Sequence, residues 1–143
     1  LYLRAAQRMA DGRADRAIPL LEAVTARSPG HFAGQFALAA CRQQVGDYRG
    51  ALERYQVAQS LAPADPRPAH NRGVVHTVNH RWAEAVTEFT DALARSPGHA
   101  PSYLNRAFVR ATLKDYPAAV EDLNRALKHG APAFQVRVSR ADA

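Results

Sequence analysis

Residues 26–31 read ARSPGH, and residues 94–99 repeat the same six letters without a change. Another proline-containing turn, LAPAD at residues 61–65, lies midway between them, so that Pro29, Pro63 and Pro97 are evenly spaced. A fixed period of about 34 residues is typical of proteins that stack one small structural unit several times. The chain of 143 residues therefore holds about four copies of this unit.

Residues of matching size recur at the same spacing along the rest of the chain. The aligned sets are Ala17, Ala51, Ala85 and Ala119; Leu21, Tyr55, Phe89 and Leu123; Ala14, Tyr48, Trp82 and Tyr116; Val24, Ala58, Ala92 and Ala126; Ala5, Ala39, Gly73 and Ala107; and the turn prolines Pro29, Pro63 and Pro97. Small side chains let two helices approach closely, while the large set fills the space towards the next unit. We expect these positions, Trp82 included, to form the core.

Apolar residues within each unit recur every three or four positions, which predicts helices. Gly46 and Asp47 interrupt this pattern, so each unit is expected to be a pair of helices. The expected helices lie near residues 1–11, 14–27, 32–45, 48–61, 66–79, 82–95, 100–113, 116–129 and 134–142. Asp47 and Asp115 can cap the helices that follow them, whereas Arg13 and Arg81 at the equivalent positions cannot. Pro19 and Pro117 are expected in first turns, where a missing amide costs little.

Residues 46–55, GDYRGALERY, followed by Ala58 and Pro63, resemble the tetratricopeptide repeat family. NRG at residues 71–73 and NRA at 105–107 are similar to the first helix of that repeat, while His80 and Lys114 replace its usual glycine between the helices. The resemblance implies an all-α, right-handed superhelical solenoid. We expect a single repeat domain over residues 1–143, with repeats at about 1–31, 32–65, 66–99 and 100–133, and with 134–143 beginning a fifth repeat or forming a cap.

Composition narrows the cellular setting. Hydrophobic residues make up 47% of the chain, so a packed core is expected, and no stretch approaches the roughly 18 apolar residues of a membrane span. Cys41 is the single cysteine, which excludes an internal disulfide and predicts a small buried side chain in a cytoplasmic protein. The first residue is Leu1, and arginine and alanine are abundant, so the chain is interpreted as part of a longer bacterial protein.

Catalysis finds no support in the sequence. It contains no nucleophile motif or glycine-rich phosphate loop, so the chain is predicted not to be an enzyme and to use no cofactor. His76 and His80 stand four residues apart, but they lack the companions of a metal site, and no metal is expected. His31 and His99 lie in equivalent turns and are expected to be exposed to solvent.

Binding is the function that the fold favours. Stacked hairpins present the first helix of each pair along an extended concave surface. The residues predicted to contact a partner there are Phe36, Gln43, Arg67, His70, Asn71, Thr77, Asn105 and Phe108. Asn side chains can both donate to and accept from a peptide backbone, and the net charge of +6 favours an acidic or neutral partner. We therefore expect a protein or peptide to bind in this groove.

Two alternatives remain open from the sequence. Single-stranded nucleic acid would suit the basic charge, but its binders present exposed aromatic residues, and most aromatic residues here occupy packing positions. A regulatory module of a larger bacterial protein, such as a signalling kinase, is the other alternative. One subfamily of the resembling repeats binds the C-terminal carboxylate of chaperone peptides. Asn71 and Asn105 match its asparagines, but Phe36, Ala40 and Pro101 occupy the places of its basic residues, so that mode is not expected. The oligomeric state is not determined by the sequence.

Overall fold

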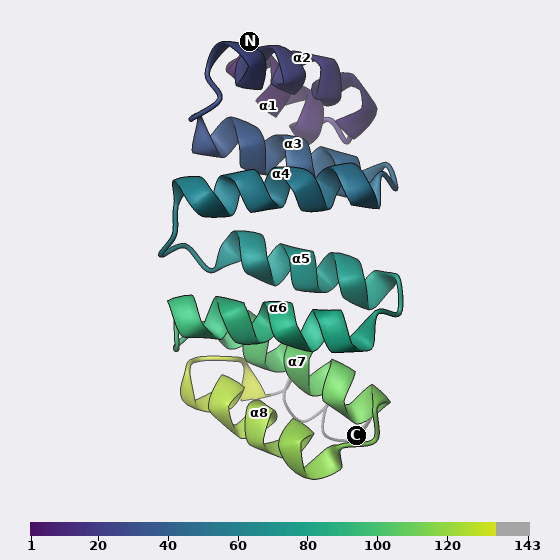
Figure 1. The fold of residues 1–143 in the computed structure, drawn as a ribbon, viewed down its shortest axis with the longest axis vertical. Helices are drawn as coiled ribbons and strands as arrows, with labels where there is room; N and C mark the ends of the chain where they lie inside the picture. Colours follow the sequence, from purple (N-terminus) through teal and green to yellow (C-terminus); the bar gives the residue numbers. More distant parts are fainter. Residues whose placement is uncertain (134–143) are drawn as a thin grey trace. The chain divides into compact units, whose positions relative to one another are not determined.

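The computed structural model describes residues 1–133, and these residues form eight α-helices and no strand (Figure 1). The helices are α1 (Tyr2–Ala10), α2 (Ala14–Arg27), α3 (Phe32–Gln44), α4 (Tyr48–Leu61), α5 (Arg67–Val78), α6 (Trp82–Arg95), α7 (Ala100–Thr112) and α8 (Tyr116–Lys128). The predicted all-α fold is confirmed, and the boundaries agree with the expected ones to within two residues. The expected helix at 134–142 lies outside the described residues.

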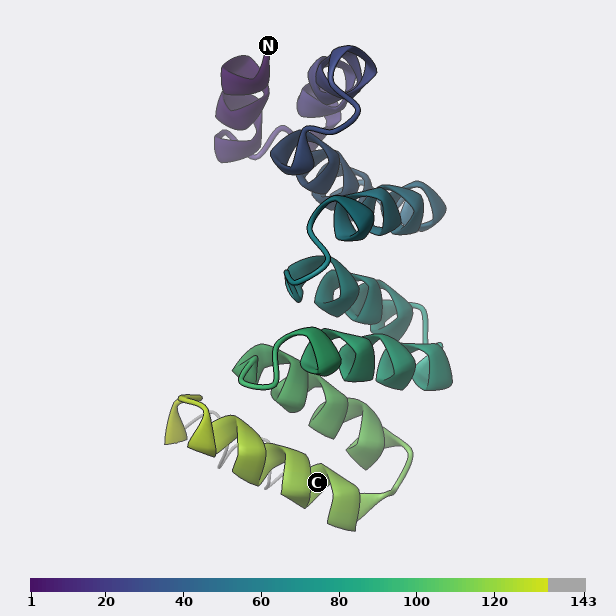
Figure 2. The same cartoon turned by 60° about the vertical axis from the view of Figure 1, so that its left-hand side comes forward.

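The chain divides into two compact units, Leu1–Pro63 and Ala64–Ala143. The first unit, called unit 1 below, contains α1 to α4, and unit 2 contains α5 to α8. In each unit two helical hairpins pack through the second helix of one and the first helix of the next, α2 on α3 and α6 on α7 (Figure 2). Alignment of the two copies of ARSPGH places the sequence of unit 1 on that of unit 2, so the two can be compared position by position.

One residue with positive φ makes the turn inside each hairpin. Gly12 has a φ of 72° and Gly46 of 87°, while His80 at 58° and Lys114 at 64° occupy the equivalent positions of unit 2. Glycine adopts this left-handed conformation readily, whereas other residues pay a steric penalty of about 1 kcal/mol or more. The departure from glycine at these two positions therefore leaves the turn intact and places strain in unit 2.

Side-chain caps form where the sequence predicts them. The Asp47 carboxylate accepts a hydrogen bond from the Gly50 amide at 3.1 Å, and Asp115 accepts from the Ala118 amide at 3.4 Å. Arg13 and Arg81 precede α2 and α6 and make no side-chain cap. Each cap stabilises its helix by about 1 kcal/mol, so in each unit the second helix of the second hairpin is stabilised by a cap and that of the first hairpin is not.

One local prediction is wrong. Pro19 lies inside α2, five residues after its first residue Ala14, rather than in the first turn. The helix continues through this proline because α2 buries Ala17, Leu21 and Val24 along one face. Burial of those side chains outweighs the roughly 3 kcal/mol that an interior proline costs a helix.

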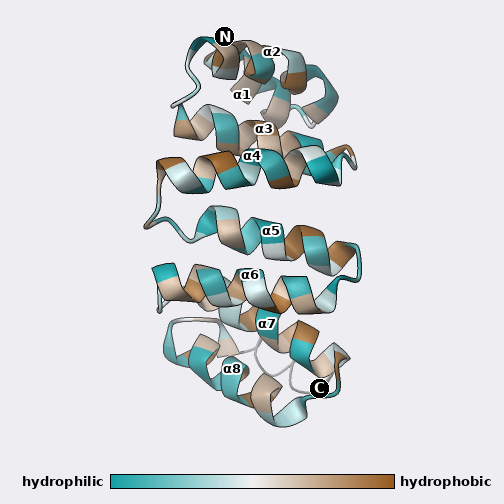
Figure 3. Ribbon diagram, in the orientation of Figure 1, coloured by the Kyte–Doolittle hydropathy of each residue, from teal (hydrophilic) through white to brown (hydrophobic). Residues whose placement is uncertain are grey.

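The repeated small residues lie in the core, as predicted. Ala5, Ala17, Ala39, Ala51, Ala85 and Ala119 are each 0% exposed. Gly73 faces the ring of Phe89 so closely that an added Cβ would stand 2.6 Å from it. Trp82 packs beside the cluster of Ala85, Phe89 and Val109, but Tyr116 in the same column is 44% exposed. Figure 3 shows the resulting interleaving of hydrophobic and hydrophilic residues along the helices.

Candidate functional site

The candidate binding surface of unit 2 lies on its two first helices, α5 and α7, which contact each other. We call it the α5–α7 surface. Its residues are Arg67, His70, Asn71, Val74, Thr77 and Val78 of α5 and Leu104, Asn105, Phe108, Ala111 and Thr112 of α7. Phe108 is 57% exposed and Val78 is 53% exposed. Two large apolar side chains therefore remain available beside the amides of Asn71 and Asn105 and the hydroxyls of Thr77 and Thr112.

His70 of α5 and Asn105 of α7 are brought together on this surface. The Asn105 amide nitrogen lies 3.3 Å from His70 Nε2, and His70 Nδ1 lies 2.8 Å from the hydroxyl of Ser102, a residue that sequence reasoning missed. The same hydroxyl lies 2.7 Å from Nδ1 of His99. An amide nitrogen only donates, so the donors run in one direction, from Asn105 to His70 to Ser102 to His99.

This directional chain requires both histidines to be neutral. Burial is the main cause that lowers the pKa of His70 to about 4, and the neighbouring charge of His99 adds to it. Burial also lowers the pKa of His99, whose ring lies 5.1 Å from the His70 ring. The expected solvent exposure of His31 and His99 is wrong. Both rings are half-buried, because each turn is short enough for the ring to fold back on its own helix, where His31 Nδ1 accepts from the Gly34 amide at 2.7 Å.

Other predicted site residues are engaged within the chain. Arg67 makes a close ion pair with Asp65 at 2.7 Å, and this partner holds the pKa of the Asp65 carboxyl below its usual value. The Thr77 hydroxyl donates to the Gly73 carbonyl at 2.8 Å. Asn71 is half-buried on the same helix. Arg67 therefore contributes less net positive potential than the sequence alone indicates.

Two predicted site residues belong to unit 1. Phe36 packs edge-on against Tyr55 with ring centres 5.6 Å apart, and Gln43 accepts a hydrogen bond from the Tyr55 hydroxyl at 2.7 Å. Both side chains thus brace the large residue of their own hairpin. They form a cluster within unit 1, whereas the other predicted site residues belong to unit 2.

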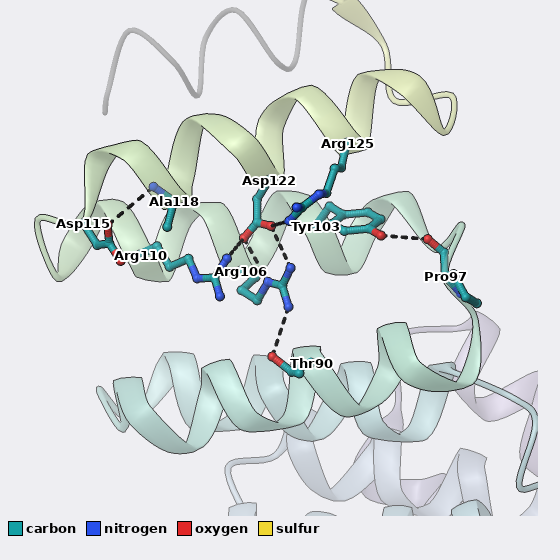
Figure 4. Close-up of polar contacts among 9 residues, drawn as sticks. All are labelled: Thr90, Pro97, Tyr103, Arg106, Arg110, Asp115, Ala118, Asp122 and Arg125. Atoms are coloured by element: carbon teal, nitrogen blue, oxygen red, sulfur yellow. Dashed lines mark hydrogen bonds and ion pairs between the residues drawn. The ribbon is translucent and has the colours of Figure 1, made fainter.

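A buried ionic network in unit 2 was not anticipated. Asp122 of α8 is 0% exposed and receives two hydrogen bonds from Arg106, at 2.9 and 2.7 Å, and one from Arg110 at 2.8 Å (Figure 4). Arg125 lies 3.6 Å from the same carboxylate, and Arg106 also donates to Thr90 of α6. The set Thr90, Arg106, Arg110, Asp122 and Arg125 is called the Asp122 network below. The available signal was the pairing of opposite charges at one constant spacing, at Arg72 and Glu88 and again at Arg106 and Asp122.

The equivalent pair one repeat earlier is less well formed. Arg72 lies 3.7 Å from Glu88, and its buried Nε has no hydrogen-bond partner. Burial raises the pKa of Glu88, with Arg72 opposing that shift. Glu88 is therefore not a solvent-exposed charge: its side chain is 16% exposed and pairs with Arg72 of α5. The second repeat of unit 2 carries the tighter of the two pairs.

No group of three or more His, Cys, Asp or Glu side chains among residues 1–133 could hold a metal ion. No helix among these residues is long and apolar enough to cross a membrane. Cys41 is 1% exposed, and burial raises the pKa of its thiol, as expected for a small core residue.

The fold and the repeat spacing define a helical repeat protein. Two models of the tetratricopeptide repeat match the sequence, one over residues 8–70 and the other over residues 71–141. The chain belongs to the tetratricopeptide repeat family. No curated protein matches its sequence.

Solved structures of similar fold are repeat proteins of several kinds. A tetratricopeptide repeat protein from Parabacteroides merdae superposes with a TM-score of 0.85 at 20% identity, covering 97% of this chain and 56% of its own. MamA from Desulfovibrio magneticus gives 0.80 at 19% identity, covering 90% and 72%. The first repeat domain of Spaghetti (RPAP3), bound to an HSP90 peptide, gives 0.71 at 19% identity, covering 77% and 87%. At these identities the likeness establishes the fold.

Proposed function

We propose that this tetratricopeptide repeat chain is a protein-interaction module that binds an extended peptide segment across α5 and α7. The segment is acidic or neutral. It is bound through its backbone by amide side chains and through an apolar side chain by Phe108. Among similar structures, the first repeat domain of Spaghetti carries a bound HSP90 peptide, which supports peptide binding as the general function.

The observation that carries the proposal is the distribution of acidic residues. None of the first helices, α1, α3, α5 and α7, contains an Asp or a Glu. Every second helix contains at least one, and α6 contains Glu84, Glu88 and Asp91. One class of helix is therefore kept free of negative charge in all four hairpins. A surface of this kind repels no acidic partner and attracts one at long range.

Asn105 supplies the polar half of the contact. Its amide nitrogen donates one hydrogen to His70, which leaves a second donor and the carbonyl oxygen for a peptide backbone. Phe108 lies three residues later on α7, so its ring is one helical turn from that amide. An exposed ring beside an oriented amide can bind a backbone group and the following apolar side chain together.

The same lack of acidic residues would also suit single-stranded RNA. Base stacking, however, needs a series of exposed rings, and α5 and α7 expose one large aromatic side chain, Phe108. The α5–α7 surface therefore favours a peptide. Short random RNA serves as a competitor in the test below.

The experiment is a selection of peptides from a displayed random library, followed by calorimetry with the full chain. Phe108→Ala should weaken binding about tenfold or more, because an exposed ring contributes little to folding and its loss removes a buried contact in the complex. The matched control is Leu127→Ala on α8, where a side chain of similar exposure (42%) lies on a second helix. Equal affinity of Phe108→Ala and the unmodified chain, or complete competition by RNA, would refute the proposal.

A further inference from the structure

A pocket of about 300 Å³ opens in unit 1 where α2, α3 and α4 meet. Its walls are Glu22, Thr25 and Ala26 of α2, Leu38 and Arg42 of α3, and Arg54 of α4. We call it the α2–α3–α4 pocket. None of these helices contributes to the α5–α7 surface, so the pocket is a separate feature.

The lining residues have counterparts at the equivalent positions of unit 2. Leu38 corresponds to Arg106, Arg42 to Arg110, Arg54 to Asp122 and Glu22 to Thr90. In unit 2 these four counterparts are the interacting core of the Asp122 network, in which a carboxylate is bound by two arginines. The pocket of unit 1 is thus the place that the Arg106–Asp122 ion pair occupies in unit 2.

Two differences open this space. Leu38 is shorter than arginine, and Arg54 replaces the buried carboxylate by a positive charge. Arg42 matches Arg110 of unit 2, but its carboxylate partners among residues 1–133 are about half exposed, Glu22 at 3.4 Å and Asp47 at 3.8 Å. Arg54 donates to Gln35 at 3.2 Å, and no carboxylate among residues 1–133 lies within ion-pair distance of it.

We propose that the α2–α3–α4 pocket binds a carboxylate supplied by a ligand, which takes the place that Asp122 has in unit 2. Arg42 and Arg54 donate to the carboxylate, and Leu38 contacts the methylene stem that carries it. Arginine suits this role because its planar group can donate two parallel hydrogen bonds to one carboxylate. The carboxylate comes either from an acidic side chain of a partner protein or from a free small organic acid.

Glu22 sets the limit on affinity. Its carboxylate pairs with Arg42 at the mouth of the pocket, so an incoming anion must share or displace that contact. Neutralising it by Glu22→Gln should therefore tighten binding severalfold. An effect of this sign distinguishes a site for anions from a site for cations.

The test is a nuclear magnetic resonance titration of the full chain, observed at the arginine side-chain N–H groups. Two probes are used, N-acetyl-glutamate N-methylamide for a protein side chain and succinate for a free acid. We expect chemical shifts of Arg42 and Arg54 that saturate with at least one probe. The probe that saturates at the lower concentration shows whether the carboxylate comes from a protein side chain or from a free acid. Shifts that rise linearly and equally at all exposed arginines with both probes would overturn the proposal.

Variants separate binding from folding. Arg54→Met keeps the apolar stem but removes the charge, so it should lower the affinity for the saturating probe at least tenfold. Arg49 is an exposed arginine of the same helix, and Arg49→Met should leave that affinity unchanged. Leu38→Arg combined with Arg54→Asp rebuilds the pair of unit 2 and should abolish binding while circular dichroism stays unchanged. Retained binding in that folded double variant contradicts the proposal. Phe108→Ala should leave the titration unchanged, so this proposal and the proposed peptide site can fail independently.

Discussion

Unit 1 and unit 2 share the hexapeptide turn and the buried small residues, but they differ in what lies where three helices meet. In unit 2 a fully buried Asp122 is bound by Arg106 and Arg110. In unit 1 the same positions hold Arg54, Leu38 and Arg42, and a pocket remains. The small residues and the turns therefore determine the backbone fold. The charged residues at this junction of three helices can differ between the units, provided that the residues that contact each other change together.

The energetic consequences of the two junctions are unequal. A buried ion pair with good geometry often contributes no more than an apolar pair of the same size, yet removal of one partner leaves a buried charge without compensation. Unit 2 is thus sensitive at positions where unit 1 is tolerant. Of the four predictions that follow, in order of decreasing effect, the first tests this difference directly and the other three test further features of unit 2.

Asp122→Ala should lower the free energy of unfolding of unit 2 by about 3–5 kcal/mol, because Arg106 would remain buried without its partner. The measurement is native-state hydrogen exchange of the α7 and α8 amides. Arg54→Ala at the equivalent position of unit 1 is the control and should cost less than about 1 kcal/mol. Equal losses at the two positions would show that the junctions are not energetically different.

Acid should destabilise unit 2 through His70. Its pKa is about 4 in the folded state and near 6.5 when unfolded, so the unfolded chain binds the proton first as the pH falls. The contribution of neutral His70 to the free energy of unfolding is fully present above about pH 6.5. It is lost as the pH falls from about 6.5 to 4, and the total loss is about 3 kcal/mol. Urea unfolding across this range should show the loss, and His70→Leu should flatten it. If His70→Leu leaves the pH dependence of the free energy of unfolding unchanged, another titrating group causes the loss of stability.

Gly73→Ala should destabilise unit 2 by about 1–3 kcal/mol, because the new Cβ would lie 2.6 Å from the Phe89 ring. Adding Phe89→Leu should recover most of this loss, since Ala107 and Leu123 form that combination one repeat later. Thermal unfolding of the single and double variants measures the coupling. If the losses of stability in the single variants simply add in the double variant, the Phe89 ring and the side chain at position 73 do not compete for the same space.

Lys114→Gly should stabilise unit 2 by about 1 kcal/mol by relieving a left-handed backbone at φ 64°. Gly46→Ala, the reciprocal change in unit 1, should cost a similar amount. Hydrogen exchange of the α8 amides measures the effect of Lys114→Gly, and that of the α4 amides measures the effect of Gly46→Ala. Opposite signs would show that the left-handed turn disfavours a side chain equally in both units, whereas two losses would indicate that Lys114 makes a compensating contact.

The sequence contained most of the fold but little of the site. Spacing and residue size predict helices, turns and core, because those features depend on a local periodicity that recurs in every repeat. The contacts of His70 with Asn105 and with Ser102 depend on which side chains of α5 and α7 meet across repeats. Arg67 and Gln43 were predicted as polar surface positions, but their partners Asp65 and Tyr55 become evident only in three dimensions. The Asp122 network was missed because charged residues are ordinarily assigned to the surface.

The most direct measurement for the proposed function is a chemical-shift map of the full chain with a library-selected peptide. We predict the largest amide shifts in α5 and α7, around Asn105 and Phe108, and contacts between the peptide and the Phe108 ring. The helices with acidic residues, α6 and α8, should change least. Shifts concentrated on α6 and α8, with the Phe108 ring unaffected, would contradict the claim that the α5–α7 surface binds the partner.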